Sequence, residues 1–202
     1  MKYYLYLLLA LLLITLIIFV NLLYYKERMK SKQYLVLYEQ LANEKVDLSV
    51  KNTYRSIEVY LNGKNFQREV EISDGRGNRL ELSQLIDKDK LVLCFSENSC
   101  DECVEAELDK LNKKNQLAGS ENVIILINAS DKRYVHQYQT NHQKYPVYEM
   151  KTNQAQLSSI IAPFFFILEK ETMRVNAAFV PLKHQPEETD KYLNKVINDY
   201  FE

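Results

Sequence analysis

Two cysteines, Cys100 and Cys103, stand three residues apart, just after an apolar run and just before a helical pattern. A C-x-x-C pair in that position is typical of a redox-active dithiol. The free N–H groups and the dipole at the start of a helix stabilise an anion, so we expect Cys100 to act as the nucleophile. Cys103 lies one helical turn further on, where its sulfur can reach Cys100 and close a disulfide.

The third cysteine, Cys94, lies inside the apolar run and is expected to behave as a small buried hydrophobe. Three clustered cysteines do not suit a framework of structural disulfides, because an odd number cannot all pair within the chain. Redox or metal chemistry at one locus fits this arrangement better.

Metal binding by the dithiol would require other ligands close to it. The three histidines of the chain are His136, His142 and His184, and we expect them on the surface or in loops. A metal site would need two or more of them near the dithiol. We therefore predict no metal and no cofactor beyond the disulfide of Cys100 and Cys103. Because a dithiol with a histidine suits a soft metal such as copper, a copper-binding chaperone remains an alternative.

The stretch from Tyr3 to Tyr25 carries no charge and has only Thr15 and Asn21 as polar interruptions. At about 1.5 Å per residue, this helix exceeds the roughly 30 Å hydrocarbon thickness of a bilayer. A cleaved signal peptide would need a shorter apolar core and a small-residue cleavage site, which the following sequence lacks. We predict a transmembrane signal anchor at residues 1–25 of a single-pass membrane protein. The formal net charge of −1 over 202 residues disfavours nucleic acid as a partner.

Residues 26–65 are predicted to form a juxtamembrane helix and a connecting strand. The helix carries an apolar stripe at i, i+3, i+4 and i+7, made of Tyr34, Leu37, Tyr38 and Leu41. This stripe suits a stalk, a dimer contact or a helix lying on its own domain. A period-two run at 56–61 predicts the strand, and Asn62-Gly63 predicts a hairpin turn into a second strand at 66–73.

The rest of the chain alternates between strand and helix patterns. A Gly-containing turn at 74–78 separates the run at 66–73 from a further period-two run at 79–85. The elements predicted after it are strand 90–96, helix 100–116, strand 122–130, helix 131–144, strands 162–170 and 174–180, and helix 186–201. This order predicts an α/β fold with a mixed central sheet flanked by helices on both faces.

The stretch from Ile72 to Leu111 contains, in order, a D-x-x-G hairpin, an L-S-x-L segment, an apolar strand and the C-x-x-C. This ordered set resembles the opening of the TlpA-like branch of thioredoxin-fold proteins, which are membrane-anchored thiol:disulfide oxidoreductases. The resemblance covers residues 66–202. It implies a thioredoxin-like domain there, with an added N-terminal β-hairpin and a preceding transmembrane helix.

The same resemblance implies a groove for a polypeptide substrate. The segment "IAPFFFIL" looks like the family's cis-proline strand, with Pro163 as the cis-proline beside the dithiol. By this resemblance, the backbone of Ala162 would hydrogen-bond an incoming polypeptide. The implied partners are polypeptide disulfides and a membrane-spanning reductant donor.

The resemblance also implies that the C-terminal domain lies outside the cytoplasmic membrane. The basic residues that follow the predicted span favour the opposite orientation, because cytoplasmic flanks are usually the more basic. The charge difference across the span is small, with only Lys2 before it and Lys26, Arg28, Lys30 and Lys32 mixed with Glu27 after it. We therefore expect an extracytoplasmic domain.

Three positions depart from the family pattern. Ser99 stands where Trp usually precedes the first cysteine, Cys94 replaces a buried polar or acidic residue, and Ala106 replaces the usual acid after the second cysteine. Glu107 returns close to the azimuth of Cys100 on the helix and is a candidate proton acceptor. The favoured alternative for Glu107 is an edge carboxylate that reaches water.

Asp101 and Glu102, between the cysteines, disfavour a thiolate and make the site negative. We therefore expect a reducing or slow dithiol rather than a strong oxidant. The predicted function is a membrane-anchored thiol:disulfide oxidoreductase that reduces or exchanges disulfides in extracytoplasmic proteins. One alternative is a redox-inactive binding or assembly module. The absence of the family's Trp and of its buried acid favours this alternative. A peroxiredoxin-like peroxidase is disfavoured, since the sequence before Cys100 lacks a Pro/Thr-containing loop.

Overall fold

The structure is a computed structural model that describes residues 2–114, 117, 121–150 and 160–202, without the side chains of residues 2–18, 20, 23, 31, 35 and 39. The described helices are α1 (Lys2–Leu61), α2 (Leu82–Leu85), α3 (Asp101–Lys113), α4 (Lys132–Asn141) and α6 (Pro186–Tyr200). The described strands are β1 (Glu71–Ser73), β2 (Arg79–Glu81), β3 (Lys90–Ser96), β4 (Val123–Asn128), β5 (Val147–Met150), β6 (Phe164–Leu168) and β7 (Val175–Phe179). The chain divides into two compact units, Met1–Val50 and Lys51–Glu202.

The first unit consists of helix α1 as far as Val50. Among the residues that the structure describes, no helix is long and apolar enough to cross a membrane. Most of the predicted span at residues 3–25 lies outside the described side chains. The transmembrane anchor and the domain boundaries predicted with it therefore stay predictions.

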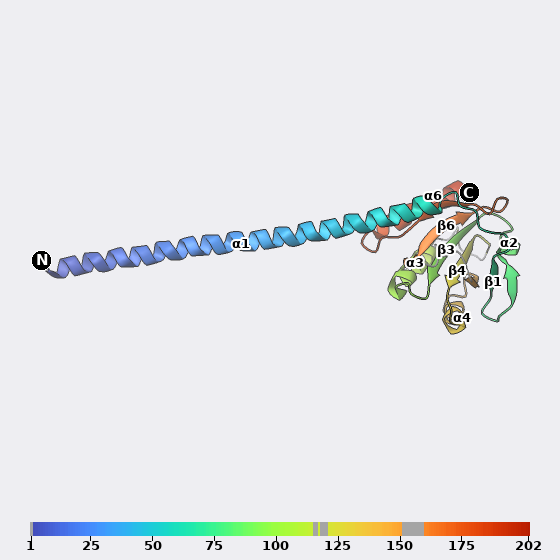
Figure 1. The fold of residues 1–202 in the computed structure, drawn as a ribbon, viewed down its shortest axis with the longest axis horizontal. Helices are drawn as coiled ribbons and strands as arrows, with labels where there is room; N and C mark the ends of the chain where they lie inside the picture. Colours follow the sequence, from blue (N-terminus) through green and yellow to red (C-terminus); the bar gives the residue numbers. More distant parts are fainter. Residues whose placement is uncertain (1, 115–116, 118–120, 151–159) are drawn as a thin grey trace. The chain divides into compact units, whose positions relative to one another are not determined.

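In the described part of the second unit, seven strands form one mixed sheet in the order β2-β1-β5-β4-β3-β6-β7. The central strand β3 pairs in parallel with β4, which pairs in parallel with β5, and on its other side β3 pairs antiparallel with β6. Helix α3 connects β3 to β4, and the antiparallel strands β6 and β7 lead into α6 (Figure 1). This arrangement, with the two cysteines at the start of α3, is the predicted thioredoxin-like fold.

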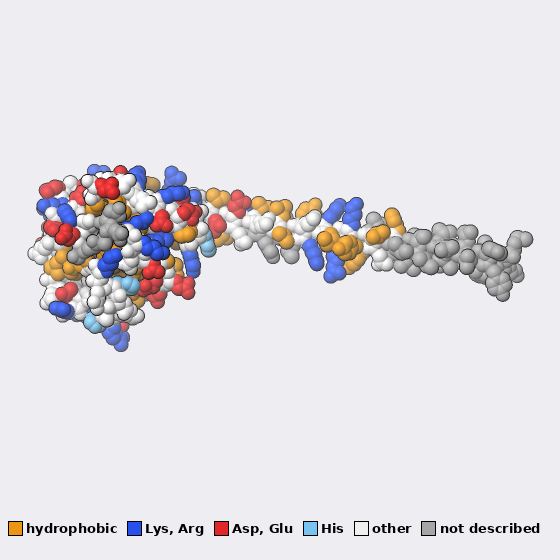
Figure 2. Space-filling view, turned by 180° about the vertical axis from the view of Figure 1, so that it is seen from behind, with side chains coloured by type: hydrophobic (Ala, Val, Ile, Leu, Met, Phe, Trp, Pro, Cys, Tyr) orange, Lys and Arg blue, Asp and Glu red, His pale blue; other side chains and the backbone are white. Residues whose placement is uncertain are grey.

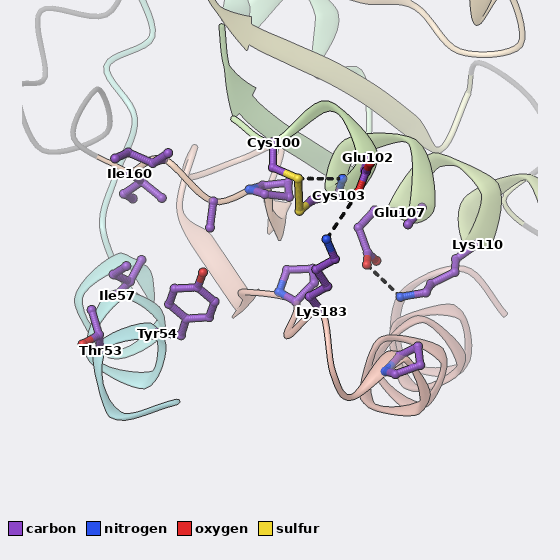
Figure 3. Close-up of a pocket in the computed structure, with 16 residues that line it drawn as sticks. Thr53, Tyr54, Ile57, Cys100, Glu102, Cys103, Glu107, Lys110, Ile160 and Lys183 are labelled. Atoms are coloured by element: carbon purple, nitrogen blue, oxygen red, sulfur yellow. Dashed lines mark hydrogen bonds and ion pairs between the residues drawn. A yellow bond between two sulfur atoms is a disulfide. The ribbon is translucent and has the colours of Figure 1, made fainter. Parts of the chain in front are cut away.

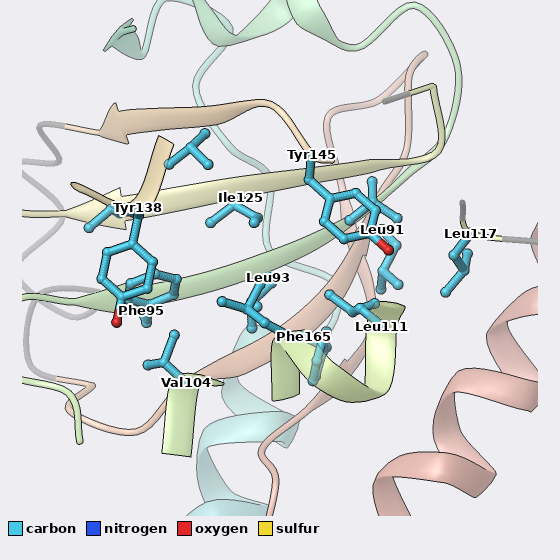
Figure 4. Close-up of a cluster of buried hydrophobic side chains, with 14 of the residues drawn as sticks. Leu91, Leu93, Phe95, Val104, Leu111, Leu117, Ile125, Tyr138, Tyr145 and Phe165 are labelled. Atoms are coloured by element: carbon cyan, nitrogen blue, oxygen red, sulfur yellow. The ribbon is translucent and has the colours of Figure 1, made fainter. Parts of the chain in front are cut away.

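Strand β3 is buried along its whole length and divides the core in two. Leu91, Leu93 and Phe95 face a cluster that α3, α4 and α6 cover (Figure 4). Val92 and Cys94 face the opposite cluster, to which the end of α1 and α2 contribute. Because side chains alternate along a strand, the continuous apolar run of β3 fills both clusters. Helices therefore cover both faces of the sheet, as predicted.

The predicted strand at 56–61 is wrong, because these residues form the last turns of α1. From residue 54 to residue 61, the half-buried or buried residues are Tyr54, Ile57, Glu58 and Leu61, which occur at i, i+3, i+4 and i+7. That spacing places them on one face of a helix, which packs against the second unit's core. The short period-two run at 56–61 was therefore part of a longer helical pattern.

The predicted hairpin at Asn62-Gly63 is wrong for a related reason. Gly63 has a φ of 82° and ends α1 in the left-handed conformation that is common after a helix C-terminus. A two-residue hairpin turn needs the same positive φ, so the Asn-Gly pair suits both structures. The chain leaves the helix along the edge of β7, where the Gly63 N–H donates to the Val175 carbonyl at 2.8 Å.

The second predicted hairpin is confirmed, with shorter strands. β1 and β2 pair antiparallel around the turn at 74–78. The Asp74 carboxylate accepts the backbone N–H groups of Arg76 and Asn78 at 2.9 and 2.8 Å, which fixes the turn. Beyond β2, the predicted strand at 79–85 becomes helix α2.

The strands and helices predicted after residue 90 occur where the sequence indicated them, with ends that differ by a few residues. β3 has the predicted bounds, 90–96. The predicted end of helix 100–116 falls partly outside the described residues, and α3 has Lys114 as its C-cap. Strand β5 follows Pro146 and was not predicted.

Candidate functional site

Cys100 and Cys103 form a disulfide at the N-terminus of α3, with their Cα atoms 5.2 Å apart. Cys100 is the N-cap residue, and its Sγ accepts the backbone N–H of Cys103 at 3.3 Å (Figure 3). The first turn of a helix has N–H groups without intrahelical partners, so a sulfur anion here gains a hydrogen bond and a favourable dipole. Cys100 is exposed and Cys103 is half-buried, so an incoming molecule meets Cys100 first.

Ser99 fixes the loop that leads into the dithiol. Its side chain is buried, and its Oγ accepts the Ser96 N–H at 3.0 Å and donates to the Ile161 carbonyl at 2.6 Å. Ser96 ends β3 and Ile161 precedes β6. One hydroxyl therefore ties the central strand, the dithiol loop and the proline segment together. The sequence indicated Ser99 only as a departure from the family's Trp.

Ala162 and Pro163 line the same cavity as Cys100 and Cys103, so the structure brings the predicted substrate-binding residues to the dithiol. The predicted cis-proline at 163 is wrong, because the described residues contain no cis peptide bond. The trans isomer is the intrinsically favoured form of an X–Pro bond, by about 0.5–1 kcal/mol. The predicted contact of the Ala162 backbone with a polypeptide stays a prediction.

A cavity of about 510 Å³ opens beside the dithiol (Figure 3). Its wall comes from the end of α1, from α3, from the segment before β6, from the segment between β7 and α6, and from the first residue of α6. The lining residues are Thr53, Tyr54, Ile57, Cys100, Glu102, Cys103, Ala106, Glu107, Lys110, Ile160, Ile161, Ala162, Pro163, Pro181, Lys183 and Pro186. A mainly apolar hollow with a few convergent polar groups is typical of a binding site.

Glu107 is a buried carboxylate in the cavity wall, one helical turn beyond Cys103. Its Oε1 pairs with the Lys110 Nζ at 2.7 Å. Burial raises the pKa of Glu107 above its ordinary value of 4.5, although Lys110 and the Thr189 side chain of α6 act to lower it. The favoured expectation of an edge carboxylate that reaches water is therefore wrong. A buried carboxylate beside a dithiol is suited to proton exchange.

The acidic residues between the cysteines have partners that the sequence did not indicate. The Glu102 carboxylate pairs with the Lys183 Nζ at 3.4 Å, and the Asp101 carboxylate accepts the Tyr134 hydroxyl at 3.2 Å. Burial raises the pKa of Tyr134, so this hydroxyl remains a donor at neutral pH. Lys183 therefore partly offsets the negative charge expected at the dithiol. Acidic and basic side chains are interspersed over the face of the second unit that Figure 2 shows.

Cys94 lies in β3 and forms no disulfide. Its side chain is 3% exposed, and burial raises the pKa of its thiol to about 12. At neutral pH it is an uncharged thiol surrounded by apolar side chains. The prediction that Cys94 behaves as a small buried hydrophobe is confirmed.

The three histidines are not among the described residues that line the dithiol cavity, although His184 directly follows Lys183, which is one. His136 and His184 are exposed, and His142 pairs with the Glu105 carboxylate at 3.0 Å. Within the described ranges, no group of three or more His, Cys, Asp or Glu side chains is placed to hold a metal ion.

No model of a known protein family matches this chain, and no curated protein matches it. Similar solved structures include a thiol:disulfide interchange protein from Bacteroides sp., which is 15% identical with a TM-score of 0.46 over 69% of this chain and 90% of its own. The exposed lipoprotein thioredoxin Etrx1 of Streptococcus pneumoniae is 15% identical with a TM-score of 0.43, covering 63% and 97%. Yeast Sco1 with copper bound is 14% identical with a TM-score of 0.45, covering 69% and 94%.

Sequence reasoning missed two parts of the cavity wall. Tyr54 and Ile57 come from the segment that the sequence assigned to a connection before the domain. Their helical spacing with Leu61 was the signal that would have shown them. Lys183 comes from the loop after β7, and no sequence pattern indicates its pairing with Glu102, which lies 81 residues away.

We expect two thiols of the reduced, folded protein to react with a thiol-specific chromogenic reagent at neutral pH. The third thiol, that of Cys94, should react only after unfolding, because it is buried and remains protonated. Absorbance measured in buffer and in guanidinium chloride gives both counts. A Cys94→Ala variant should give two thiols in both conditions. Three reactive thiols in the folded wild-type protein would contradict this burial.

Proposed function

We propose that this protein is a thiol:disulfide oxidoreductase that reduces or exchanges disulfides in polypeptides. The observation that carries the proposal is the exposed Cys100 Sγ at the N-terminus of α3, bonded to Cys103 and hydrogen-bonded to its N–H. A mainly apolar cavity next to these sulfurs offers room for substrate. A structural disulfide would gain nothing from this exposed position at a helix N-terminus.

The first step is attack by the reduced protein on a substrate disulfide. The Cys100 thiolate forms a bond to one substrate sulfur, the substrate S–S bond breaks, and the second substrate sulfur leaves as a thiolate. The N–H groups of the first turn of α3 stabilise the Cys100 thiolate before it attacks. The product is a mixed disulfide between Cys100 and the substrate.

The second step resolves the mixed disulfide. The Cys103 sulfur loses its proton and attacks the Cys100 sulfur, the bond to the substrate breaks, and the substrate leaves as a thiolate that takes up a proton. The Cys100–Cys103 disulfide forms, and two electrons have passed from the protein to the substrate. Glu107, one helical turn beyond Cys103 and in the same cavity, accepts the Cys103 proton.

The completed cycle needs a donor that returns two electrons to the disulfide. We propose that a membrane-spanning dithiol protein fills this role and that residues 1–25 anchor the chain in the membrane with its C-terminal domain outside the cytoplasm. The uncharged apolar composition of residues 3–25 supports the anchor. Protein disulfides persist mainly in oxidising compartments, which supports the extracytoplasmic location.

Replacing Cys103 by alanine should trap substrates on the protein. Without a resolving thiol, the mixed disulfide through Cys100 has no internal attacker and accumulates. Non-reducing electrophoresis after acid quenching, followed by mass spectrometry, identifies the adducts and the cysteine that carries them. The matched control Cys100→Ala should form at least about tenfold fewer adducts, because Cys103 is less exposed. Equal and negligible adducts in both variants would favour the redox-inactive module.

Glu107→Gln should slow the resolution step, because the amide cannot accept the Cys103 proton. We expect a loss of up to about 100-fold in the decay rate of a preformed mixed disulfide. In the wild-type protein this rate should rise as pH increases through the raised pKa of Glu107, since only the carboxylate accepts a proton. The glutamine variant should lack that inflection.

The matched control for this measurement is Asp109→Asn, an exposed carboxylate on the same helix that does not line the cavity. Stopped-flow decay of the mixed disulfide between pH 4 and pH 8 gives both profiles. An inflection that survives in Glu107→Gln, or that disappears in Asp109→Asn, would assign the proton to another group.

A further inference from the structure

The last turns of α1 form one wall of the dithiol cavity. Thr53, Tyr54 and Ile57 line it, and Figure 3 shows Tyr54 and Ile57 projecting from the helix toward the hollow. Both side chains are half-buried and pack against the core cluster on that face of the sheet. A segment that lies before the sheet in the sequence therefore contributes side chains to the site.

Side chains of α1 and the residue after it fix this wall to the sheet. The Glu58 Oε1 accepts the Val180 N–H at 2.9 Å, and the Asn62 Oδ1 accepts the Ala178 N–H at 2.9 Å. Leu61, between them, is buried in the core. Tyr54 and Ile57 are consequently held at set positions across the cavity from the dithiol, as a pre-organised binding surface requires.

The charged groups of the cavity wall occur as two ion pairs. Glu107 pairs with Lys110 at 2.7 Å, and Glu102 pairs with Lys183 at 3.4 Å. The wall therefore presents little net charge to an occupant, and its remaining surface is mainly apolar. An occupant gains free energy here by burying apolar area, whereas a charged group would be desolvated next to residues that are already ion-paired with one another.

Ile161 adds an exposed apolar side chain, 63% accessible, where the cavity meets the surface. Ile161 and the exposed Cys100 both line this cavity. A substrate cysteine that reacts with Cys100 places its neighbouring residue at this apolar hollow.

From this geometry we propose that Tyr54 and Ile57 determine substrate specificity, by selecting polypeptides that carry a large apolar side chain next to the reacting cysteine. This inference rests on the proposed function and narrows its substrate class to locally uncharged segments with residues such as Leu or Phe beside the cysteine. According to this proposal, the end of α1 is the part of the redox site that determines specificity.

Binding of unreactive peptides to the oxidised full chain tests the inference without any redox turnover. One labelled peptide carries Phe and Leu beside an alanine that replaces the cysteine, and its matched peptide carries Ser and Gln there. Fluorescence anisotropy in a mild detergent should show at least tenfold tighter binding of the apolar peptide to the wild-type chain. Tyr54→Ala should lose most of this preference. Tyr60→Ala, on the same helix outside the cavity, should keep it.

If Tyr54→Ala fails to fold, two further variants replace it, Ile57→Ser and Tyr54→Gln. Both should reduce the preference for the apolar peptide. Equal binding of the two peptides to the wild-type chain would overturn the inference. A dimer that Tyr54→Ala dissolves, with no peptide preference, would assign the cavity to a second copy of this chain and also overturn it. A preference for the apolar peptide with no adducts in Cys103→Ala would retain the binding surface and reject the oxidoreductase.

Discussion

The placement of the Cys100 Sγ at the first turn of α3 is the constraint on which the rest of this structure depends. The sulfur accepts the N–H of Cys103, and only four residues separate the end of β3 from the start of α3. Burial of β3 on both faces and docking of α3 on one of them fix the two ends of that connection. Ser99 fixes its middle, since one hydroxyl bonds to the ends of two different segments.

The cavity beside the dithiol determines the environment in which the two sulfurs react. The apolar wall lowers the local polarity, and the two ion pairs keep the wall nearly neutral. Glu107 differs from the other charged residues of the wall, because its carboxylate is buried and burial raises its pKa. Burial of such a group has a cost for stability, which the ion pair with Lys110 partly offsets.

The elements that position the dithiol were predictable from the sequence because their signals are local. β3 is a continuous apolar run, and α3 begins at a C-x-x-C followed by an apolar stripe. The end of α1 was not predictable from a six-residue window, in which Ile57 and Leu61 fit both a strand and a helix. Gly63 added to the ambiguity, since a positive φ suits a hairpin turn and a helix end alike.

The parts of the site that escaped prediction depend on contacts between distant segments. The burial of Glu107 depends on the packing of α6 against α3, and the pairing of Glu102 with Lys183 joins α3 to a loop after β7. The most direct measurement of the central claim is a brief iodoacetamide pulse on the reduced full chain at pH 7, read by mass spectrometry of its peptides. Cys100 should be alkylated at least about tenfold faster than Cys103. Equal rates, or faster alkylation of Cys103, would contradict the assignment of Cys100 as the attacking sulfur.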